Sequence, residues 1–133
     1  MKFISTKVHG IMDYAMGLLV MVSPWLFGFY AGGPETWVPV IMGGTLIGYS
    51  ILTKYELGLI RIIPMQGHLI LDIISGIVLA ASPWIFGFSE LVFVPHLVFG
   101  ILEVGAGVCT VNKPYAARHT GDMGKYSQNI PKA

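Results

Sequence analysis

Two pairs of side chains in this sequence of 133 residues have the types and the spacing to do chemistry. His9 stands four residues before Asp13, and His68 stands four residues before Asp72. Residues four apart in an α-helix lie on one face, one turn apart. Each imidazole could therefore reach its own carboxylate, and the two pairs could converge into one polar cluster.

Three kinds of chemistry are open to such a cluster. Each aspartate could accept a hydrogen bond from its own histidine, which would form a local polar clasp and fix the rotation of the helix. The four side chains could bind a divalent metal such as zinc or iron, and two histidines could also serve as axial ligands of a haem. The two carboxylates could share a proton or a cation and pass it part-way across a membrane.

Two further ionisable residues lie on a later apolar stretch. His96 and Glu103 are seven residues apart and would share a helical face. Glu103 is the charge furthest inside an apolar stretch and could pair with a histidine of the cluster. The full candidate cluster is His9, Asp13, His68, Asp72, His96 and Glu103. Gly17 and Gly76 extend the two His–Asp stripes by one turn and are expected to let the helices that carry them approach closely.

The composition is typical of a membrane protein. Hydrophobic residues make up 54% of the chain and charged residues 11%, whereas roughly a quarter of a soluble domain is charged. Mean hydropathy is +0.70. The net charge of +1 gives no electrostatic basis for binding nucleic acid.

Four apolar segments are long enough to cross a bilayer, which takes about 20 residues of helix. They span residues 5–28, 36–54, 64–87 and 91–111. The sequence therefore predicts an all-α membrane protein with one domain of four transmembrane helices over residues 1–111. Residues 112–133 are polar, and we expect them to form a flexible cytoplasmic tail.

The basic residues predict the orientation. All eight Lys and Arg lie before or near the start of the first segment, between the end of the second and the start of the third, or after the fourth. The connections between the first and second segments and between the third and fourth contain Glu35 and Glu90 as their only charged residues. The positive-inside rule then places both termini and the middle loop in the cytoplasm.

The chain contains an internal repeat. With a shift of 59, residues 7–29 and 66–88 are identical at 10 of 23 positions. The two repeats cover about 5–54 and 64–111. Each contains an even number of spans, so the halves are parallel and related by a pseudo-two-fold axis along the membrane normal.

The repeated element that stands out is Ser-Pro-Trp-x-Phe-Gly-Phe. Its residues are Ser23, Pro24, Trp25, Phe27, Gly28 and Phe29, and again Ser82, Pro83, Trp84, Phe86, Gly87 and Phe88. Proline has no amide hydrogen, so the carbonyls four residues earlier lose their helical partner, and the serines are placed to supply one. Ser-Pro is also typical of a helix start, so each span either kinks there or ends and continues as a short turn. The glycines would permit chain reversal and the tryptophans would anchor the interface.

Two copies of this motif at the ends of two apolar segments resemble the SPW-repeat family of small integral membrane proteins. In that family a helical pair carries Ser-Pro-Trp in its first helix. The resemblance covers about residues 5–112. It implies a multi-pass protein of a bacterial or archaeal inner (cytoplasmic) membrane, and it supplies no catalytic residues.

The sequence predicts a non-enzymatic integral membrane protein of structural or accessory type, because it contains no P-loop, dinucleotide fingerprint or nucleophile elbow. Expected partners are the lipid bilayer and either a membrane protein or further copies of the chain, and no cofactor is predicted. One alternative is a small proton, cation or solute carrier that uses Asp13, Asp72 and Glu103. The other is a metal- or haem-binding redox module that uses His9 and His68.

Overall fold

The computed structural model describes residues 2–113, which form four helices. They are α1 (Thr6–Leu26), α2 (Pro34–Ile51), α3 (Met65–Ile85) and α4 (Val94–Cys109). The predicted all-α fold with four helices is confirmed. The polar tail predicted over 112–133 lies outside the described residues from 114 onward.

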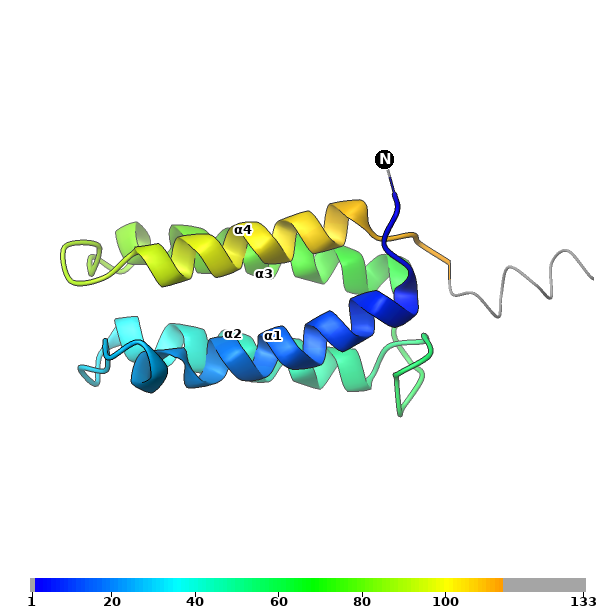
Figure 1. Ribbon diagram of the computed structural model, residues 1–133, viewed down its shortest axis with the longest axis horizontal. Coiled ribbons are helices and arrows are strands. Elements are labelled where there is room, and N and C mark those ends of the chain that lie inside the picture. Colours follow the sequence, from blue (N-terminus) through cyan, green and yellow to red (C-terminus); the bar gives the residue numbers. More distant parts are fainter. Residues whose placement is uncertain (1, 114–133) are drawn as a thin grey trace, which may run out of the picture.

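The helices form two antiparallel pairs. Helix α1 packs along α2 and α3 packs along α4, and the two pairs lie side by side (Figure 1). Contacts between the pairs are fewer, and most of them join α2 to α3. Each pair corresponds to one sequence repeat, so the interface between the pairs is also the interface between the repeats.

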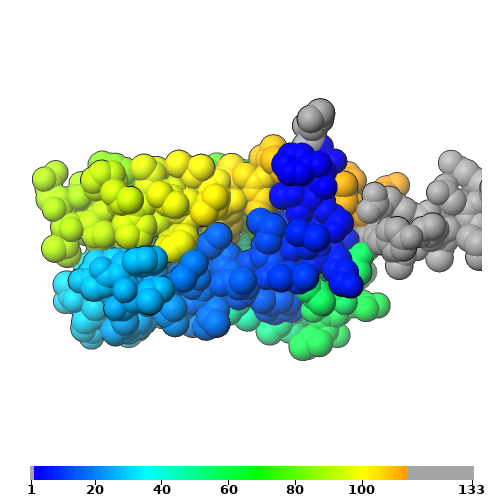
Figure 2. All heavy atoms as spheres, viewed as in Figure 1, coloured from blue at the N-terminus to red at the C-terminus, as the bar shows by residue number. Residues whose placement is uncertain are grey.

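Short extended segments link the two repeats at one end of the bundle. Ile4, just before α1, forms a parallel bridge with Thr110, just after α4. Ile63, just before α3, forms the equivalent bridge with Thr53, just after α2. Figure 2 shows the first residues of the chain (dark blue) lying against the end of α4 (orange). The pseudo-two-fold relation therefore extends beyond the helices.

The distribution of polarity is inverted relative to a soluble protein. Among the described residues, 14 polar or charged side chains are buried and only 9 hydrophobic ones, while 31 large hydrophobic side chains are exposed. Helix α3 is long and apolar enough to cross a bilayer, with a mean hydropathy of 1.7 over its most apolar part. Helix α4 is also apolar, but with 16 residues it is shorter than a typical membrane-spanning helix. Among the described helices, α3 alone has both the length and the composition expected of a membrane span.

The expectation that Gly17 and Gly76 bring α1 and α3 together is wrong. A side chain at Gly17 would collide with α2 near Gly43, and one at Gly76 would collide with α4 near Gly100. Both glycines therefore serve the close packing of helices within one repeat. The space between α1 and α3 is filled by the side chains of the His–Asp pairs instead.

Each Ser-Pro-Trp motif satisfies the backbone that its proline disrupts. Ser23 Oγ donates to the carbonyl oxygen of Val20 at 2.7 Å, and Ser82 Oγ donates to that of Leu79 at 2.7 Å. These are the two carbonyls that the missing proline amides leave without a helical partner. The serine hydroxyls thus perform the role that the sequence suggests for them.

The motif ends the helix and does not start a new one. Helix α1 continues through Pro24 and stops at Leu26, so Ser23 is not an N-cap. Gly28 follows with a φ of 70°, and the Phe29 amide donates to the Pro24 carbonyl at 2.9 Å. This is the Schellman pattern, in which glycine adopts the left-handed conformation just after the helix.

The second repeat ends α3 in the same way. Gly87 has a φ of 71°, and the Phe88 amide donates to the Pro83 carbonyl at 2.8 Å. Trp25 and Trp84 lie outside this hydrogen bonding and are 54% and 55% exposed. The motif therefore combines a helix terminator with an exposed indole.

The pairing of serine with proline can be tested by a double-mutant cycle. We expect Ser23→Ala to lower the free energy of unfolding by about 1–3 kcal/mol, because it leaves the buried Val20 carbonyl without a partner. In a Pro24→Ala background the same substitution should cost little, since an alanine in place of the proline supplies a backbone amide for that carbonyl. Unfolding in detergent micelles followed by circular dichroism measures both. An equal cost in the two backgrounds would show that the serine does not compensate for the proline.

Candidate functional site

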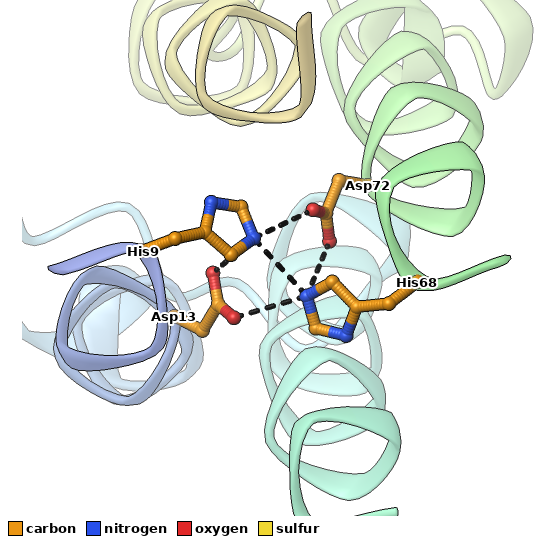
Figure 3. A group of neighbouring side chains, drawn as sticks. All are labelled: His9, Asp13, His68 and Asp72. Carbon is orange, nitrogen blue, oxygen red and sulfur yellow. Dashed lines mark hydrogen bonds and ion pairs between the residues drawn. The ribbon is translucent and has the colours of Figure 1, made fainter. Parts of the chain in front are cut away.

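The first turns of α1 and α3 bring together His9, Asp13, His68 and Asp72, which we call the His–Asp cluster. Each histidine is the fourth residue of its helix, and each aspartate follows one turn later. The four side chains point toward one another across the interface between the repeats (Figure 3). All four are buried.

The cluster is closed by contacts between the repeats. Nε2 of His9 lies 3.1 Å from Nε2 of His68. It lies 3.0 Å from Oδ2 of Asp72, in the other repeat, and 3.3 Å from Oδ1 of its own Asp13. His68 Nε2 lies 3.0 Å from Asp13 Oδ2 and 3.4 Å from its own Asp72 Oδ1. Each imidazole is thus nearest to the carboxylate of the opposite helix, and the clasp joins the repeats more than it fixes one helix.

Two threonines orient the imidazoles from behind. Thr110 Oγ1 lies 2.9 Å from His9 Nδ1, and Thr53 Oγ1 lies 2.8 Å from His68 Nδ1. Each hydroxyl also donates to a backbone carbonyl, of Ala106 at 2.6 Å and of Tyr49 at 2.7 Å. A hydroxyl has one proton and a carbonyl only accepts, so each threonine must accept from an Nδ1–H. Nε2, the nitrogen that faces the cluster, is then the free acceptor of the neutral ring.

The threonines are the functional residues that the sequence reasoning misses. They sit just beyond α2 and α4, in the halves of the repeats where sequence identity is weak. Each serves the histidine of the other repeat. A search for matching polar residues at the ends of the second helices of the repeats could have found them.

Glu103 extends the cluster toward the middle of the bundle. It accepts from the Ser75 hydroxyl. The Tyr49 hydroxyl lies 2.8 Å from Asp72 Oδ1 and 3.2 Å from Glu103 Oε1, and so bridges the two carboxyl groups. The expected pairing of Glu103 with a histidine does not occur. A small cavity of about 20 Å³ is lined by Asp13, Asp72 and Glu103 together with apolar side chains, which is room for about one water molecule.

His96 lies apart from the cluster. It lies in the first turn of α4, at the end of the bundle opposite the cluster. Its Nε2 is 3.1 Å from the backbone carbonyl oxygen of Glu35. Its ring packs against Phe29 and Phe88, with ring centroids 5.4 and 5.0 Å away. The seven residues from His96 to Glu103 correspond to about 10 Å of helix, so a shared face does not mean a shared site. His96 instead ties the two repeats together at the end opposite the His–Asp cluster.

The loop after α2 covers the cluster on one side. Tyr55 lies over the ring of His68, with centroids 5.7 Å apart, and is buried. Burial, together with the nearby charge of Asp13, raises the pKa of the Tyr55 hydroxyl, so this group stays protonated. Tyr55 therefore adds bulk and a neutral surface to the site but no charge.

The geometry discriminates among the chemistries that the sequence leaves open. Bis-histidine haem ligation places the two nitrogens on opposite faces of the ring, about 4 Å apart for bonds near 2.0 Å. The two Nε2 atoms of the cluster are 3.1 Å apart, closer than haem ligation requires. Two imidazole nitrogens and two carboxylates that face a common point can instead hold protons or a single metal ion.

The bridge from Tyr49 can be tested with a matched control. We expect Tyr49→Phe to lower the free energy of unfolding by about 1–3 kcal/mol, because a buried carboxylate loses a hydrogen-bond donor. Tyr55→Phe removes a buried hydroxyl that has no hydrogen-bond partner, so its effect should be small. Denaturant titration of both variants in detergent gives the comparison. Similar losses would mean that the Tyr49 bridge contributes nothing specific.

Comparison with known proteins adds one finding. No curated protein and no solved structure matches the chain. The family model of the SPW repeat domain matches residues 7–110, which include all four helices but the first residue of α1. The match covers most of the sequence, and both Ser-Pro-Trp motifs and the whole His–Asp cluster fall within it. The chain therefore belongs to the SPW repeat domain family.

Proposed function

We propose that this protein is a non-enzymatic, four-span integral membrane protein of the bacterial or archaeal inner membrane, with a structural or accessory role. The observation that carries the proposal is the inverted polarity: ionisable side chains lie inside the bundle and large hydrophobic side chains cover the outside. In water this arrangement would expose a large apolar surface. In a bilayer the same surface faces lipid, and the polar groups are satisfied within the protein.

The lengths of the helices are compatible with four spans. Helices α1 and α3 have 21 residues each, about 31 Å of helix, close to the thickness of the hydrocarbon core. Helix α4 has 16 residues, about 24 Å. The exposed side chains of Leu91 and Phe93, just before it, continue its apolar surface. Helix α2 has 18 residues and carries its one acidic residue, Glu35, in its first turn.

The charges support cytoplasmic termini. Lys2, Lys7, Lys54 and Arg61 lie at the end of the bundle that holds the His–Asp cluster. The other end carries Glu35, in the first turn of α2, and Glu90, in the loop after α3, and its loops contain no basic residue. By the positive-inside rule, the cluster end faces the cytoplasm and the Ser-Pro-Trp end faces outward. The half-exposed Trp25 and Trp84 then lie at the outer interface, where indole rings are favoured.

The proposed role follows from how the repeats are joined. The His–Asp cluster and the two extended bridges hold the helical pairs together at one end, and the contact of His96 with Glu35 holds them at the other. Such a frame keeps two lipid-facing pairs in a fixed relation. A fixed arrangement of this kind suits a scaffold for a membrane-protein partner or for further copies of the chain.

The topology can be tested by cysteine labelling. In a Cys109→Ser background, we expect Ala31→Cys and Glu90→Cys to react with a membrane-impermeant maleimide in intact cells or spheroplasts. Leu59→Cys, in the middle loop, should react only after permeabilisation. All three positions are exposed, so protein burial does not confound the comparison. Labelling of Leu59→Cys from outside would contradict the four-span topology.

The accessory role predicts a stable association. Purification from native membranes in a mild detergent should recover one membrane protein with the chain in a constant ratio. Replacing Asp13 and Asp72 by alanine should weaken the association, because the helical pairs lose their fixed relation, whereas Tyr55→Phe should retain it. Quantitative mass spectrometry measures the ratio, and circular dichroism checks that the variants remain helical. Repeated recovery of the chain alone would contradict an accessory role.

A further inference from the structure

The His–Asp cluster has the donor set, the orientation and the charge of a metal centre, and we propose that it binds one divalent transition-metal ion of the zinc type. The ligands would be Nε2 of His9, Nε2 of His68 and one carboxylate oxygen each from Asp13 and Asp72. The inference goes beyond the proposed membrane role, and it rests only on the part of that role in which the cluster joins the repeats.

The first observation is the orientation of the imidazoles. Because Thr110 and Thr53 accept from the Nδ1–H groups, the Nε2 lone pairs of the neutral rings point into the cluster. Metal-bound histidines are typically held in this way, with the second ring nitrogen donating to a neighbouring oxygen that fixes the tautomer. The two Nε2 atoms lie 3.1 Å apart. Two lone pairs at that distance repel unless a proton or a metal cation lies between them.

The second observation is a buried oxygen with no donor. Oδ2 of Asp72 has no hydrogen-bond partner, although the residue is only 1% exposed. It lies 3.0 Å from His9 Nε2, which can donate to it only when the ring carries a second proton. An acceptor buried without a donor is costly and rare in folded proteins. A cation in the cluster would satisfy it together with both nitrogens.

The separations of the atoms fit tetrahedral coordination. Ligand atoms about 2.0–2.1 Å from a zinc ion lie about 3.3 Å from one another at the corners of a tetrahedron. Each imidazole Nε2 lies 3.0 Å from an oxygen of the aspartate in the opposite repeat, and 3.3 or 3.4 Å from an oxygen of the aspartate in its own repeat, so these contacts involve both oxygens of each aspartate. One ligand atom from each of the four residues can be chosen so that all lie within 4.8 Å of one another. With one oxygen chosen from each aspartate, the carboxylates would rotate inward to close the set around one ion.

The charge of the cluster also fits. Two aspartates and two neutral histidines carry a charge of −2, and a single divalent cation cancels it. This balance matters because all four residues are buried, and uncompensated charge is very unfavourable in a medium of low dielectric constant. The hydroxyl groups of Tyr49 and Ser50 lie within hydrogen-bond distance of Asp72 and Asp13, which orients the carboxylates from outside.

The donor types select the class of metal. Magnesium and calcium prefer six or more oxygen ligands, whereas two imidazoles and two carboxylates in four-fold coordination are typical of zinc. Iron, cobalt and nickel also accept imidazole and carboxylate, and cobalt can serve as a spectroscopic substitute. Since the four ligands come from both repeats, the bound ion would join the two helical pairs.

The test begins with the full-length chain purified in detergent, stripped with a chelator and reloaded. We expect one zinc ion per chain by elemental analysis, and a cobalt-loaded form with the intense visible absorption of four-coordinate Co²⁺. X-ray absorption of the zinc form should give two nitrogen and two oxygen ligands at about 2.0–2.1 Å. These measurements require no substitution, so they stand even where a variant fails to fold.

Variants then assign the site. His9→Ala and His68→Ala should each abolish stoichiometric binding, whereas His96→Ala, which removes another buried histidine, should leave it unchanged. Thr53→Val combined with Thr110→Val should weaken binding by about 10–100-fold, because the ligands remain but lose their orientation. This loss of affinity without loss of a ligand is the readout that a merely structural cluster would not give.

Several results would overturn the proposal. A folded, monodisperse chain that binds neither zinc nor cobalt would show that the cluster holds protons only, and it would leave the membrane topology and the accessory role untouched. Binding that persists in both His9→Ala and His68→Ala would place the ion elsewhere. A six-coordinate, all-oxygen environment in the X-ray absorption would exclude the proposed ligand set.

Discussion

Polar groups that are shut away from water must find their partners within the protein, and the arrangement of these four helices depends on that constraint. The sites of greatest polarity lie where the two helical pairs meet, and the surfaces that meet no other helix are apolar. His9 and His68 could not be buried on separate helices without the opposite aspartates and the threonines behind them. The interface between the repeats is therefore specified by chemistry as much as by shape.

The same constraint explains the motif that marks the family. At one end of α1 and α3, a proline removes an amide and the preceding serine satisfies the carbonyl left behind. At the other end, a threonine hydroxyl donates to a carbonyl of the last turn of α2 or α4 and accepts from a histidine. In both places one hydroxyl group serves the backbone at a helix end. The Ser-Pro-Trp residues thus belong to the architecture, whereas the metal binding that we propose rests on the histidines and aspartates.

The make-up of the His–Asp cluster and the role of the motif serines could be predicted from the sequence, because an internal repeat shows which residues occupy equivalent positions in the fold. A shift of 59 places His9 and His68, and Asp13 and Asp72, at equivalent positions, and helical geometry then puts each pair on one face. The role of Ser23 follows from the covalent structure of the proline after it. The rest depends on how the helices cross. Gly17 and Gly76 face the partner helix within their own repeat. Glu103 contacts Tyr49 and Ser75, and His96 lies at the far end of the bundle. The spacing of residues along the chain does not reveal these packing contacts.

The crossed bridges at the cluster end have a consequence for the origin of the fold. Ile4 pairs with Thr110 and Thr53 pairs with Ile63, so each repeat lends the other the strand segment and the threonine that its histidine needs. A single repeat would be incomplete, and two copies related by a two-fold axis would complete each other. The present chain has the form of such a symmetric dimer fused by gene duplication, with its polar centre on the former symmetry axis. Once the halves are covalently linked, each can diverge, and Glu103, whose equivalent in the first repeat is Ile47, records that loss of symmetry.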